Sequence, residues 1–386
     1  MKSMKIVIAA DSFKGSLSSA QVVERISAGL ACALPGAELV CLPIADGGEG
    51  TVEAFSIAAN GTLYPATVHD PLGREVTARY CILPDGAAVI EMAQASGLLL
   101  LGPDELDPLS ASTYGTGELI RCALDRGCRR FIVGVGGSAT TDGGSGMARA
   151  LGVEMLDSAG RPLPMGGGPL IRLDRIDCGP MDSRIRECSF LVASDVDNVL
   201  CGPAGAAAVY GPQKGADPQA IRALDAALRH YGRLLASQLG VDVANRPGAG
   251  AAGGLGAGLM AFCGAEVRSG IDTILDMIGF DQAVADADLV ITGEGRIDFQ
   301  SARGKVPYGV ARRTKGRRDI PVVAVVGCMG QGAEVMYRHG LDAIVPISDG
   351  TLPLAESMRR AGELLESTAR RLVTLPELST TVFMGY

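Results

Sequence analysis

The chain has 386 residues, of which 47% are hydrophobic and 20% are charged, and this length suits two globular domains. Its formal net charge is −8, which argues against a nucleic-acid-binding protein, because such a surface needs clustered Lys and Arg. The longest uncharged stretch, 247–265, has seven glycines and little Leu, Ile or Val, so a membrane span is not expected.

The two chain-wide signals for cellular location agree with each other. The N-terminus runs directly into a short apolar segment that ends at Asp11, which is typical of a first strand and not of a signal peptide. The ten cysteines are scattered and contain no C-x-x-C pair, so neither a zinc site nor a disulfide framework is indicated. We therefore expect a cytoplasmic protein with reduced thiols.

The first residues alternate between strand and helix patterns. Strands are predicted at 5–11 and 37–44, and each is followed by a helix, at 19–34 and 51–60. The first helix is predicted from Val22, Val23, Ile26 and Leu30, whose spacing places them on one face.

The middle of the chain has a different pattern. Residues 67–93 alternate apolar and polar side chains between turn signals, which predicts an antiparallel meander. A helix at 115–127, a strand at 131–135, a helix from about 143 and a strand at 190–196 follow. These elements predict a mixed α/β domain.

Strand and helix patterns alternate again in the last third of the chain. Strands are predicted at 287–293, 320–327 and 343–347, with helices at 306–315, 332–340 and 354–373. Such alternation of apolar strands with helices indicates a parallel sheet covered on both faces. Two strands before the middle and three after it fit a flavodoxin-like domain formed by 1–63 plus 285–386, interrupted by an inserted mixed α/β domain at 64–284.

Polar, glycine-containing clusters follow five of these strands. They begin at Asp11, Asp46, Gly136, Asp195 and Glu294. One such cluster would fit a helix cap or a turn, since Asp, Ser and Gly serve both purposes. Five together supply carboxylates, separate cations and glycine amides at the edge where open α/β sheets bind ligands, which favours a Mg²⁺–phosphate site.

The stretch GGSATTDGGSG at 136–146 follows an apolar strand and has the composition of a phosphate-binding loop. Its amides and hydroxyls can donate to phosphate oxygens, and a helix begins after it. The loop contains no Lys, so we expect Lys14 or Lys214 to supply the positive charge.

Two other glycine motifs are weak. GAGAAG at 248–253 satisfies G-x-G-x-x-G but does not follow a buried strand, so it does not predict a dinucleotide site. The common phosphate-loop ending is also absent, because Gly304 and Lys305 are followed by Val306.

Eight motifs in this order resemble the bacterial glycerate kinase family of type 1. They are DSFKGSLS, ADGGEGT, GTGELI, GGSATTDGGSGMARALG, SDVDN, GPQKGA, GAGAAGGLGAGL and ADLVITGEGRID, and they extend across nearly the whole chain. The departures are small and remove no charged group: Thr141 replaces the more usual Asn, Val199 a common Pro and Ser301 a frequent Thr.

The resemblance implies a kinase that transfers the γ-phosphoryl group of ATP to D-glycerate with Mg²⁺, with 2-phospho-D-glycerate as the favoured product. It also implies that the inserted domain is restriction-endonuclease-like and that the reaction takes place in an interdomain cleft. The expected partners are ATP and D-glycerate, without nucleic acid or membrane, and a homodimer stays open.

Candidate site residues follow from the clusters and the resemblance together. The catalytic candidates are Asp195, Lys14 and Glu294, and the metal candidates are Asp195 and Asp197. The candidates for substrate binding are Asp11, Ser12, Asp46, Gly47, Gly48, Glu49 and Arg296. The candidates for cofactor binding are Gly136, Gly137, Ser138, Thr140, Thr141 and Lys214.

Three alternatives remain at this point. The product of a glycerate kinase could be 3-phosphoglycerate, or the acceptor could be another small hydroxy acid. A protein on the same scaffold could also bind a nucleotide or a sugar acid without catalysis.

Overall fold

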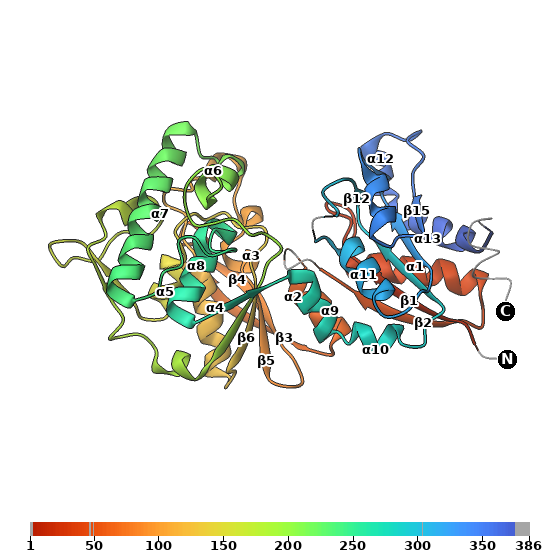
Figure 1. Ribbon diagram of the computed structural model, residues 1–386, viewed down its shortest axis with the longest axis horizontal. Coiled ribbons are helices and arrows are strands. Elements are labelled where there is room, and N and C mark those ends of the chain that lie inside the picture. Colours follow the sequence, from red (N-terminus) through yellow and green to blue (C-terminus); the bar gives the residue numbers. More distant parts are fainter. Residues whose placement is uncertain (1–2, 46–47, 49, 303, 375–386) are drawn as a thin grey trace. The chain divides into compact units, whose positions relative to one another are not determined.

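The chain divides into two units, and segments far apart in the sequence build unit 1 (Figure 1). Unit 1 consists of residues 1–46, 53–60 and 271–386, and unit 2 of residues 47–52 and 61–270. The computed structural model describes residues 3–45, 48, 50–302 and 304–374. Residues 271–284 group with unit 1, whereas the sequence-based boundary placed them in the inserted domain. The division into domains 1–63 plus 285–386 and 64–284 stays a prediction.

The sheet of unit 1 has five strands, all paired in parallel. Its order is β2-β1-β11-β13-β15. The bounds are β1 Lys5–Ala10, β2 Glu38–Pro43, β11 Leu289–Gly293, β13 Val322–Val326 and β15 Ala343–Pro346. The five strands and the parallel sheet predicted from the sequence are therefore confirmed.

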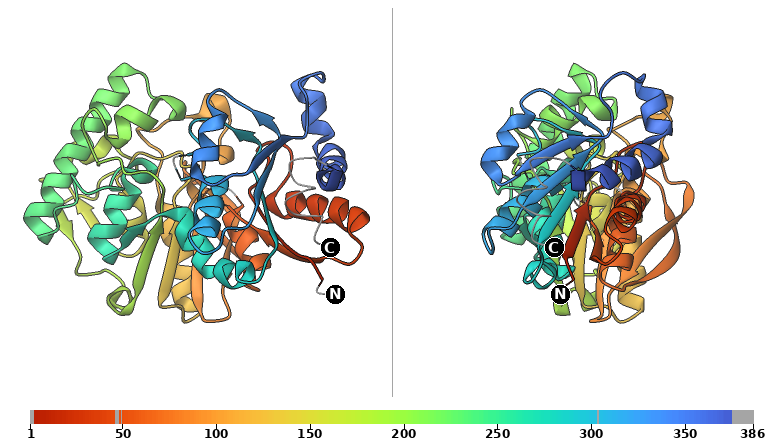
Figure 2. Two further views of the ribbon diagram at one scale, coloured as in Figure 1. Left: turned by 45° about the vertical axis from the view of Figure 1, so that its right-hand side comes forward. Right: turned by 90° about the vertical axis from the view of Figure 1, so that its right-hand side faces the viewer.

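Alternate side chains of the unit 1 strands point to opposite faces of the sheet. Ile6 and Ile8 of β1 belong to a core that also contains residues of α1 (Ser19–Ala33) and α13 (Ala361–Arg371). These two helices, separated by most of the sequence, lie side by side (Figure 2). Helix α11 (Val306–Lys315) contacts β11, β1 and β13 and buries Val306 and Val310.

The start of α1 shows why this segment is helical. Ser18 accepts a hydrogen bond from the Gln21 amide, and the Gln21 side chain accepts one from the Ser18 amide. This capping box pairs two donors that the first helical turn would otherwise leave without a partner. The predicted apolar face of the helix, which includes Val22 and Ile26, is buried.

Two predicted helices of unit 1 differ from the structure. The single helix expected at 354–373 is interrupted at Arg360, which has φ −98° and ψ 10°, and forms α12 (Leu354–Arg359), α13 and the 3₁₀ segment η7 (Leu372–Thr374). At the end of α12 the Met358 carbonyl accepts a hydrogen bond from Ser16 Oγ, so a tertiary contact holds this turn. Residues Ala333–His339 form a 3₁₀ helix, η6.

The sheet of unit 2 has six strands in the order β10-β9-β6-β5-β4-β3. Their bounds are β3 Thr62–His69, β4 Glu75–Ile82, β5 Ala87–Glu91, β6 Arg130–Gly134, β9 Ser189–Ala193 and β10 Glu266–Arg268. Strands β3, β4 and β5 pair antiparallel, which confirms the predicted meander, and β5, β6, β9 and β10 pair in parallel. In that parallel part Glu91 lies opposite Gly134, and Gly134 opposite Ala193.

The remaining elements complete the two units. In unit 1 they are α2 Thr51–Ala58 and α9 Gly270–Met277 (both of which begin in unit 2), α10 Phe280–Val284, and the paired β12 Arg296–Ile297 and β14 Cys328–Met329. In unit 2 they are α3 Ala93–Ser96, α4 Tyr114–Asp125, α5 Ser145–Ala150, α6 Ala206–Tyr210, α7 Pro218–Leu239, α8 Ala251–Cys263, β7 Glu154–Leu156 and β8 Arg175–Asp177. Five short 3₁₀ segments, Leu98–Leu100, Pro103–Glu105, Gly168–Arg172, Ser183–Glu187 and Pro212–Lys214, also belong to unit 2.

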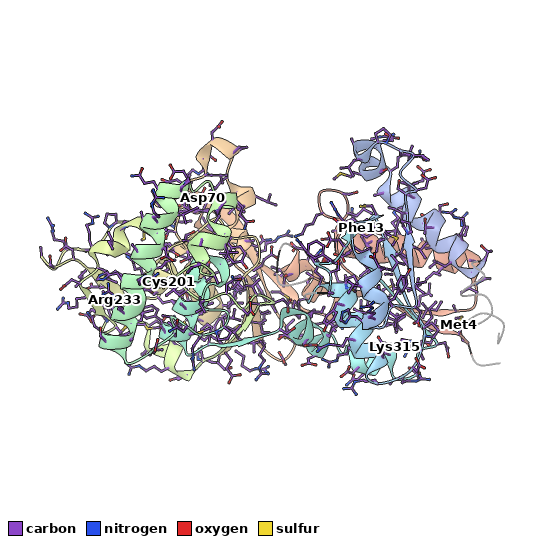
Figure 3. All side chains as sticks on the ribbon, turned by 45° about the horizontal axis from the view of Figure 1, so that its top comes forward. Met4, Phe13, Asp70, Cys201, Arg233 and Lys315 are labelled. Atoms are coloured by element: carbon purple, nitrogen blue, oxygen red, sulfur yellow. The ribbon has the colours of Figure 1, made fainter. Side chains whose placement is uncertain are left out.

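Each unit has its own buried core. In Figure 3, Met4 and Phe13 mark side chains of unit 1, and Cys201 marks one of unit 2. Met4 and Phe13 are buried in the core of unit 1, and Cys201 packs against the core of unit 2. Within the described part of the chain, no helix is long and apolar enough to cross a membrane.

Candidate functional site

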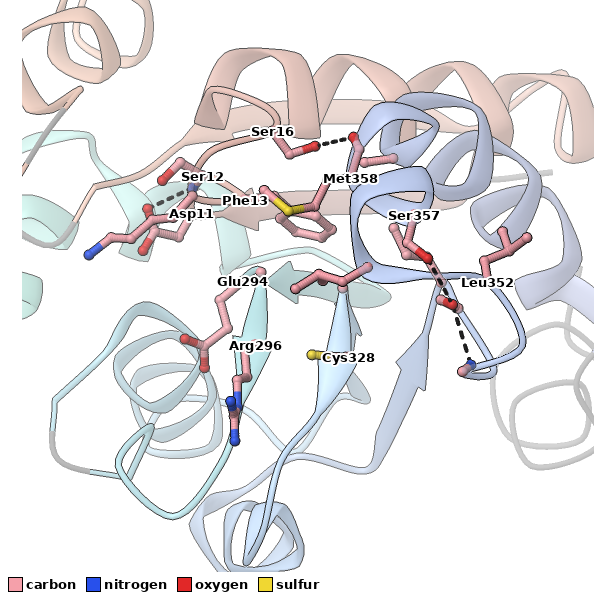
Figure 4. A pocket seen from close by; sticks show the side chains of 18 of the residues that line it. Asp11, Ser12, Phe13, Ser16, Glu294, Arg296, Cys328, Leu352, Ser357 and Met358 are labelled. Atoms are coloured by element: carbon pink, nitrogen blue, oxygen red, sulfur yellow. Dashed lines mark hydrogen bonds between the residues drawn. The ribbon is translucent and has the colours of Figure 1, made fainter.

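A pocket of unit 1 contains five of the predicted site residues. Its volume is about 510 Å³, and it lies at the carboxyl ends of the parallel strands (Figure 4). The predicted residues that line it are Asp11, Ser12, Lys14, Glu294 and Arg296. They meet because β1 and β11 are paired with Ala10 opposite Gly293, so the residues that follow the two strands emerge at the same edge.

Glu294 is the most buried of these groups, with 5% of its surface exposed. One of its carboxylate oxygens accepts a hydrogen bond from Ser301 Oγ at 2.5 Å, and the other lies 3.1 Å from Lys305 Nζ. Burial raises the pKa of Glu294, although the Ser301 hydrogen bond and the Lys305 charge act in the opposite direction. Glu294 is therefore a carboxylate in a pocket, oriented by Ser301 and Lys305 and more basic than an exposed glutamate. These are the properties expected of a general base.

The other predicted residues line the same pocket and differ in how exposed they are. Asp11 is 8% exposed, and its Oδ1 accepts a hydrogen bond from the Ser12 amide at 2.6 Å. Lys14 is exposed, and 65% of the Arg296 side chain is exposed. Arg296 Nε lies 3.5 Å from an oxygen of Asp298, a distance that leaves the guanidinium able to bind an anion.

Lys305 was missed as a site residue by the sequence analysis. It lines the pocket, forms an ion pair with Glu294 and occupies the N-cap position of α11. It was noted only as part of a phosphate-loop motif that fails at Val306. The available signal was its position: a Lys after glycine and immediately before a helix, downstream of a strand-end carboxylate.

The glycine loop of unit 2 is held by a buried cation. Lys214 is 1% exposed, and its Nζ donates to Ser138 Oγ at 2.7 Å and to the Thr140 carbonyl at 2.6 Å. The structure therefore brings Lys214 to the loop, as expected. The Lys214 ammonium group binds atoms of the loop itself and is not presented to a ligand. Burial of this side chain lowers the pKa of Lys214 to about 7.

Removing this charge changes how stability depends on pH. The pKa of Lys214 is about 7 in the folded chain and 10.5 ordinarily, so between these values the unfolded chain binds a proton that the folded chain has released. The free energy of unfolding of the parent protein therefore rises with pH across this interval relative to that of Lys214→Met. Urea unfolding of both proteins at several pH values measures this, and parallel curves would contradict the depressed pKa.

The hydroxyl groups of the loop are less accessible than a phosphate site requires. Thr140 and Thr141 have no exposed surface, and within the described residues their Oγ1 atoms have no hydrogen-bond partner. Ser138 is 7% exposed, whereas Gly137 is exposed and Gly136 is partly exposed. The loop's role in cofactor binding stays a prediction, and the exposed backbone of Gly136 and Gly137 is the part that a ligand can reach here.

The carboxylate of the same loop has a structural function. Asp142 is fully buried, and it accepts hydrogen bonds from the Thr113 amide at 2.8 Å and from the amides of Gly144 and Gly146 at 3.0 and 3.1 Å. Burial nevertheless raises its pKa. These contacts fix the turn that begins α5.

The aspartates after β9 do not share a strand face. The strand ends at Ala193, so the predicted strand at 190–196 extends three residues too far. Asp195 accepts hydrogen bonds at 2.9 Å from Ser269 Oγ and the Gly270 amide, which pull the chain out of the strand, and Asp197 is exposed. Their catalytic and metal roles stay predictions.

The cluster after β2 is only partly described. Asp46, Gly47 and Glu49 lie outside the described residues. The Gly48 carbonyl accepts a hydrogen bond from Thr51 Oγ1 at 2.6 Å at the start of α2. The buried Glu91, at the end of β5, accepts hydrogen bonds from the amides of Gly50 and Val52 in the same region.

The fold and the pocket together define a mixed α/β protein with a candidate ligand site at the carboxyl edge of a parallel sheet. A family model described as the glycerate kinase family matches residues 6–377. This chain belongs to that family.

Individual relatives match over nearly their whole length. A glycerate kinase from Bacillus subtilis (strain 168) is 47% identical, covering 99% of this chain and 100% of the relative. A glycerate 2-kinase from Escherichia coli (strain K12) is 46% identical, covering 96% of this chain and 97% of the relative. A crystal structure from Salmonella typhimurium LT2, assigned as a glycerate kinase 2, matches with a TM-score of 0.87 and 46% identity, covering 98% of this chain and 100% of that one.

Proposed function

We propose that this chain is a glycerate kinase that transfers the γ-phosphoryl group of ATP to D-glycerate and forms 2-phospho-D-glycerate. The observation that carries the proposal is its 45–48% identity, over nearly the full length, to relatives named glycerate kinase or glycerate 2-kinase. The unit 1 pocket supports it, because phosphoryl transfer depends on positioned cations and a group that accepts a proton.

In the proposed reaction, a hydroxyl oxygen of glycerate attacks the γ-phosphorus of ATP. The bond from this phosphorus to the β,γ-bridging oxygen breaks, and ADP leaves. Glu294 accepts the hydroxyl proton, since its raised pKa makes it a stronger base than an exposed carboxylate. Lys14 neutralises developing charge on the phosphoryl oxygens, and Arg296 binds the glycerate carboxylate, aided by Asp11, Ser12 and the segment 46–49.

Mg²⁺ is part of the proposal. It binds proteins through one or two carboxylates and takes its remaining ligands from phosphates and water. The described residues contain no group of three or more candidate ligands, which is compatible with an ion held mainly by the nucleotide. Asp195 and Asp197 are the carboxylates proposed to hold Mg²⁺. When bound, the ion would neutralise negative charge on the phosphates.

Other parts of the proposal concern architecture. The order of the unit 1 strands, 2-1-3-4-5 along the unit, supports a flavodoxin-like assignment. The restriction-endonuclease-like insert and the reaction in an interdomain cleft are proposed from the family resemblance. The cytoplasmic location is proposed from the scattered cysteines, and a homodimer stays open.

Two substitutions test the catalytic assignment. Asp195→Asn and Lys14→Ala are each expected to lower kcat/KM for ATP-dependent phosphorylation of D-glycerate by about 100-fold or more, since each removes a charge proposed to act in the transition state. Asp174→Asn, at an exposed aspartate of the same unit as Asp195, is the control and should have parent activity. If both variants fold and keep near-parental kcat/KM, the site is wrongly placed.

Product analysis separates the remaining functions. NMR spectroscopy of the product from D-glycerate is expected to show the phosphoryl group on the 2-hydroxyl, whereas a 3-phosphate would overturn the regiochemistry. A panel of small hydroxy acids, assayed for ADP formation, should give D-glycerate the highest kcat/KM. ATP binding without turnover on any of the acids would instead indicate a non-catalytic protein.

A further inference from the structure

The unit 1 pocket has an apolar end that the proposed substrate does not explain. Phe13, Leu352 and Met358 line it (Figure 4), and Ile347 and Leu354 also belong to the pocket lining. Leu354 is 73% exposed in the first turn of α12. This end therefore offers apolar surface that a ligand could cover.

The other end of the pocket carries positive charge. Lys14, Arg296 and Lys305 line it, beside Asp11 and Glu294. Lys305 is fixed at the start of α11, and its side chain is 34% exposed. The pocket thus combines an apolar wall with a group of cations inside one unit.

Glycerate matches only the charged end. It is a three-carbon hydroxy acid without apolar surface, and the pocket volume of about 510 Å³ lies in the range of about 300–1,000 Å³ that is typical of sites for much larger ligands. A nucleoside triphosphate has the required two-ended chemistry, with a flat aromatic base and a polyanion.

We propose that the nucleotide binds in this pocket, with its base against Leu352, Leu354 and Met358 and its phosphates toward Lys14 and Lys305. The inference rests on the proposed kinase function and deepens it, because it assigns the nucleotide to unit 1. Lys214 and the buried side chains of the glycine loop then serve to hold that loop and do not contact the base. Arg296 keeps its proposed role toward glycerate.

Cys328 provides a direct test, because its exposed thiol lines the pocket. The parent protein is treated with a maleimide reagent, and labelling is followed by peptide mass spectrometry. The non-hydrolysable imido analogue of ATP, at saturation, is expected to slow labelling of Cys328 at least about tenfold, both alone and in the presence of saturating D-glycerate. D-glycerate alone is expected to slow it less, because Arg296, its proposed partner, is paired with Cys328 between β12 and β14. Cys32, exposed on α1 and outside the pocket lining, is the internal control and should react at an unchanged rate.

A variant tests the apolar wall separately. Leu354→Ser is expected to raise the Kd of the imido analogue about tenfold, which is the effect of losing about 1.4 kcal/mol of binding free energy. Its Kd for inorganic tripolyphosphate should not change. Leu99→Ser, at a leucine of unit 2 that is 78% exposed, is the matched control and should bind the analogue as the parent does.

The outcomes separate the inference from the proposed function. If Cys328 reacts equally fast with and without the analogue in a chain that phosphorylates glycerate, or if Leu354→Ser binds the analogue normally, the nucleotide does not occupy this pocket and the inference fails alone. If D-glycerate protects Cys328 and the analogue does not, the pocket is the glycerate site and the inference also fails. Protection by the analogue in a chain that phosphorylates no glycerate would support the inference and overturn the proposed function.

Discussion

Replacing Glu294 by Gln is expected to lower kcat for glycerate phosphorylation by about 10²–10⁴-fold, the usual contribution of a general base. Gln keeps the size of the side chain and can still accept a hydrogen bond from Ser301, but it cannot accept a proton. A coupled assay of ADP formation under saturating ATP and D-glycerate measures the effect. The KM for glycerate should change much less, because Arg296 is the residue proposed to bind the glycerate carboxylate.

A matched substitution controls for the loss of a carboxylate. Glu334→Gln changes an exposed glutamate of unit 1, in η6, and it should leave kcat unchanged. If Glu294→Gln folds and retains a kcat within about threefold of the parent, a general-base role for Glu294 is excluded.

The pH dependence of the parent enzyme gives a second measurement of the same residue. Burial raises the pKa of Glu294 above its ordinary 4.5, and a base must be ionised to accept a proton. The kcat/KM of the parent should therefore fall as the pH decreases through a value above 4.5. In Glu294→Gln this acid limb should disappear from the residual activity, and an identical limb in both proteins would assign it to another group.

The sheet of unit 1 and the meeting of Asp11 and Glu294 in one pocket could be predicted because the relevant signals are local. Each strand is a short apolar run that ends in a polar or glycine residue, so its C-terminal edge can be located from the sequence. Parallel pairing then places Asp11 and Glu294 at one edge, since Ala10 and Gly293 are partners. The pocket contains both residues, as the strand ends indicated.

The contacts around these residues could not be predicted in the same way, because they depend on tertiary structure. Lys305 reaches Glu294 across eleven positions of sequence, and nothing in its own neighbourhood indicates this ion pair. The burial of Lys214 also depends on long-range contacts, with Ser138 and Thr140. The position of Asp195 outside β9 likewise depends on a long-range contact, since Ser269 and Gly270 donate hydrogen bonds to its carboxylate.

The second glycine-rich stretch, 248–258, shows how a motif can have a purely structural explanation. Gly254 and Gly258, in α8, lie against Gly143 and Gly144 of the glycine loop: a Cβ at Gly254 would stand 2.8 Å from the Gly143 Cα, and one at Gly258 2.9 Å from the Gly144 Cα. The Gly143 amide also donates to the Gly253 carbonyl at 3.0 Å. The two glycine-rich segments therefore pack backbone to backbone within unit 2.

Replacing Gly253 by Ala is expected to reduce the free energy of unfolding by more than about 4 kcal/mol, an exceptional loss for one substitution. Gly253 has a φ of +68°, and a Cβ there would stand 1.9 Å from the Thr140 carbonyl oxygen and 2.6 Å from the Thr141 Cα. The backbone of Thr140 and Thr141 leaves the new methyl group no space, so the loop and α8 must separate. Urea unfolding followed by circular dichroism measures the loss.

Gly264→Ala separates the steric effect at Gly253 from the cost of its backbone conformation. Gly264 has a φ of +63°, but nothing lies within 4 Å of the position that its Cβ would take. This variant should therefore lose only about 1–2 kcal/mol, the cost of a left-handed conformation for a residue with a Cβ. Equal losses of unfolding free energy in the two variants would show that the loop and α8 can move apart at little cost. If Gly253→Ala fails to fold while Gly264→Ala is stable, the two segments must meet without side chains.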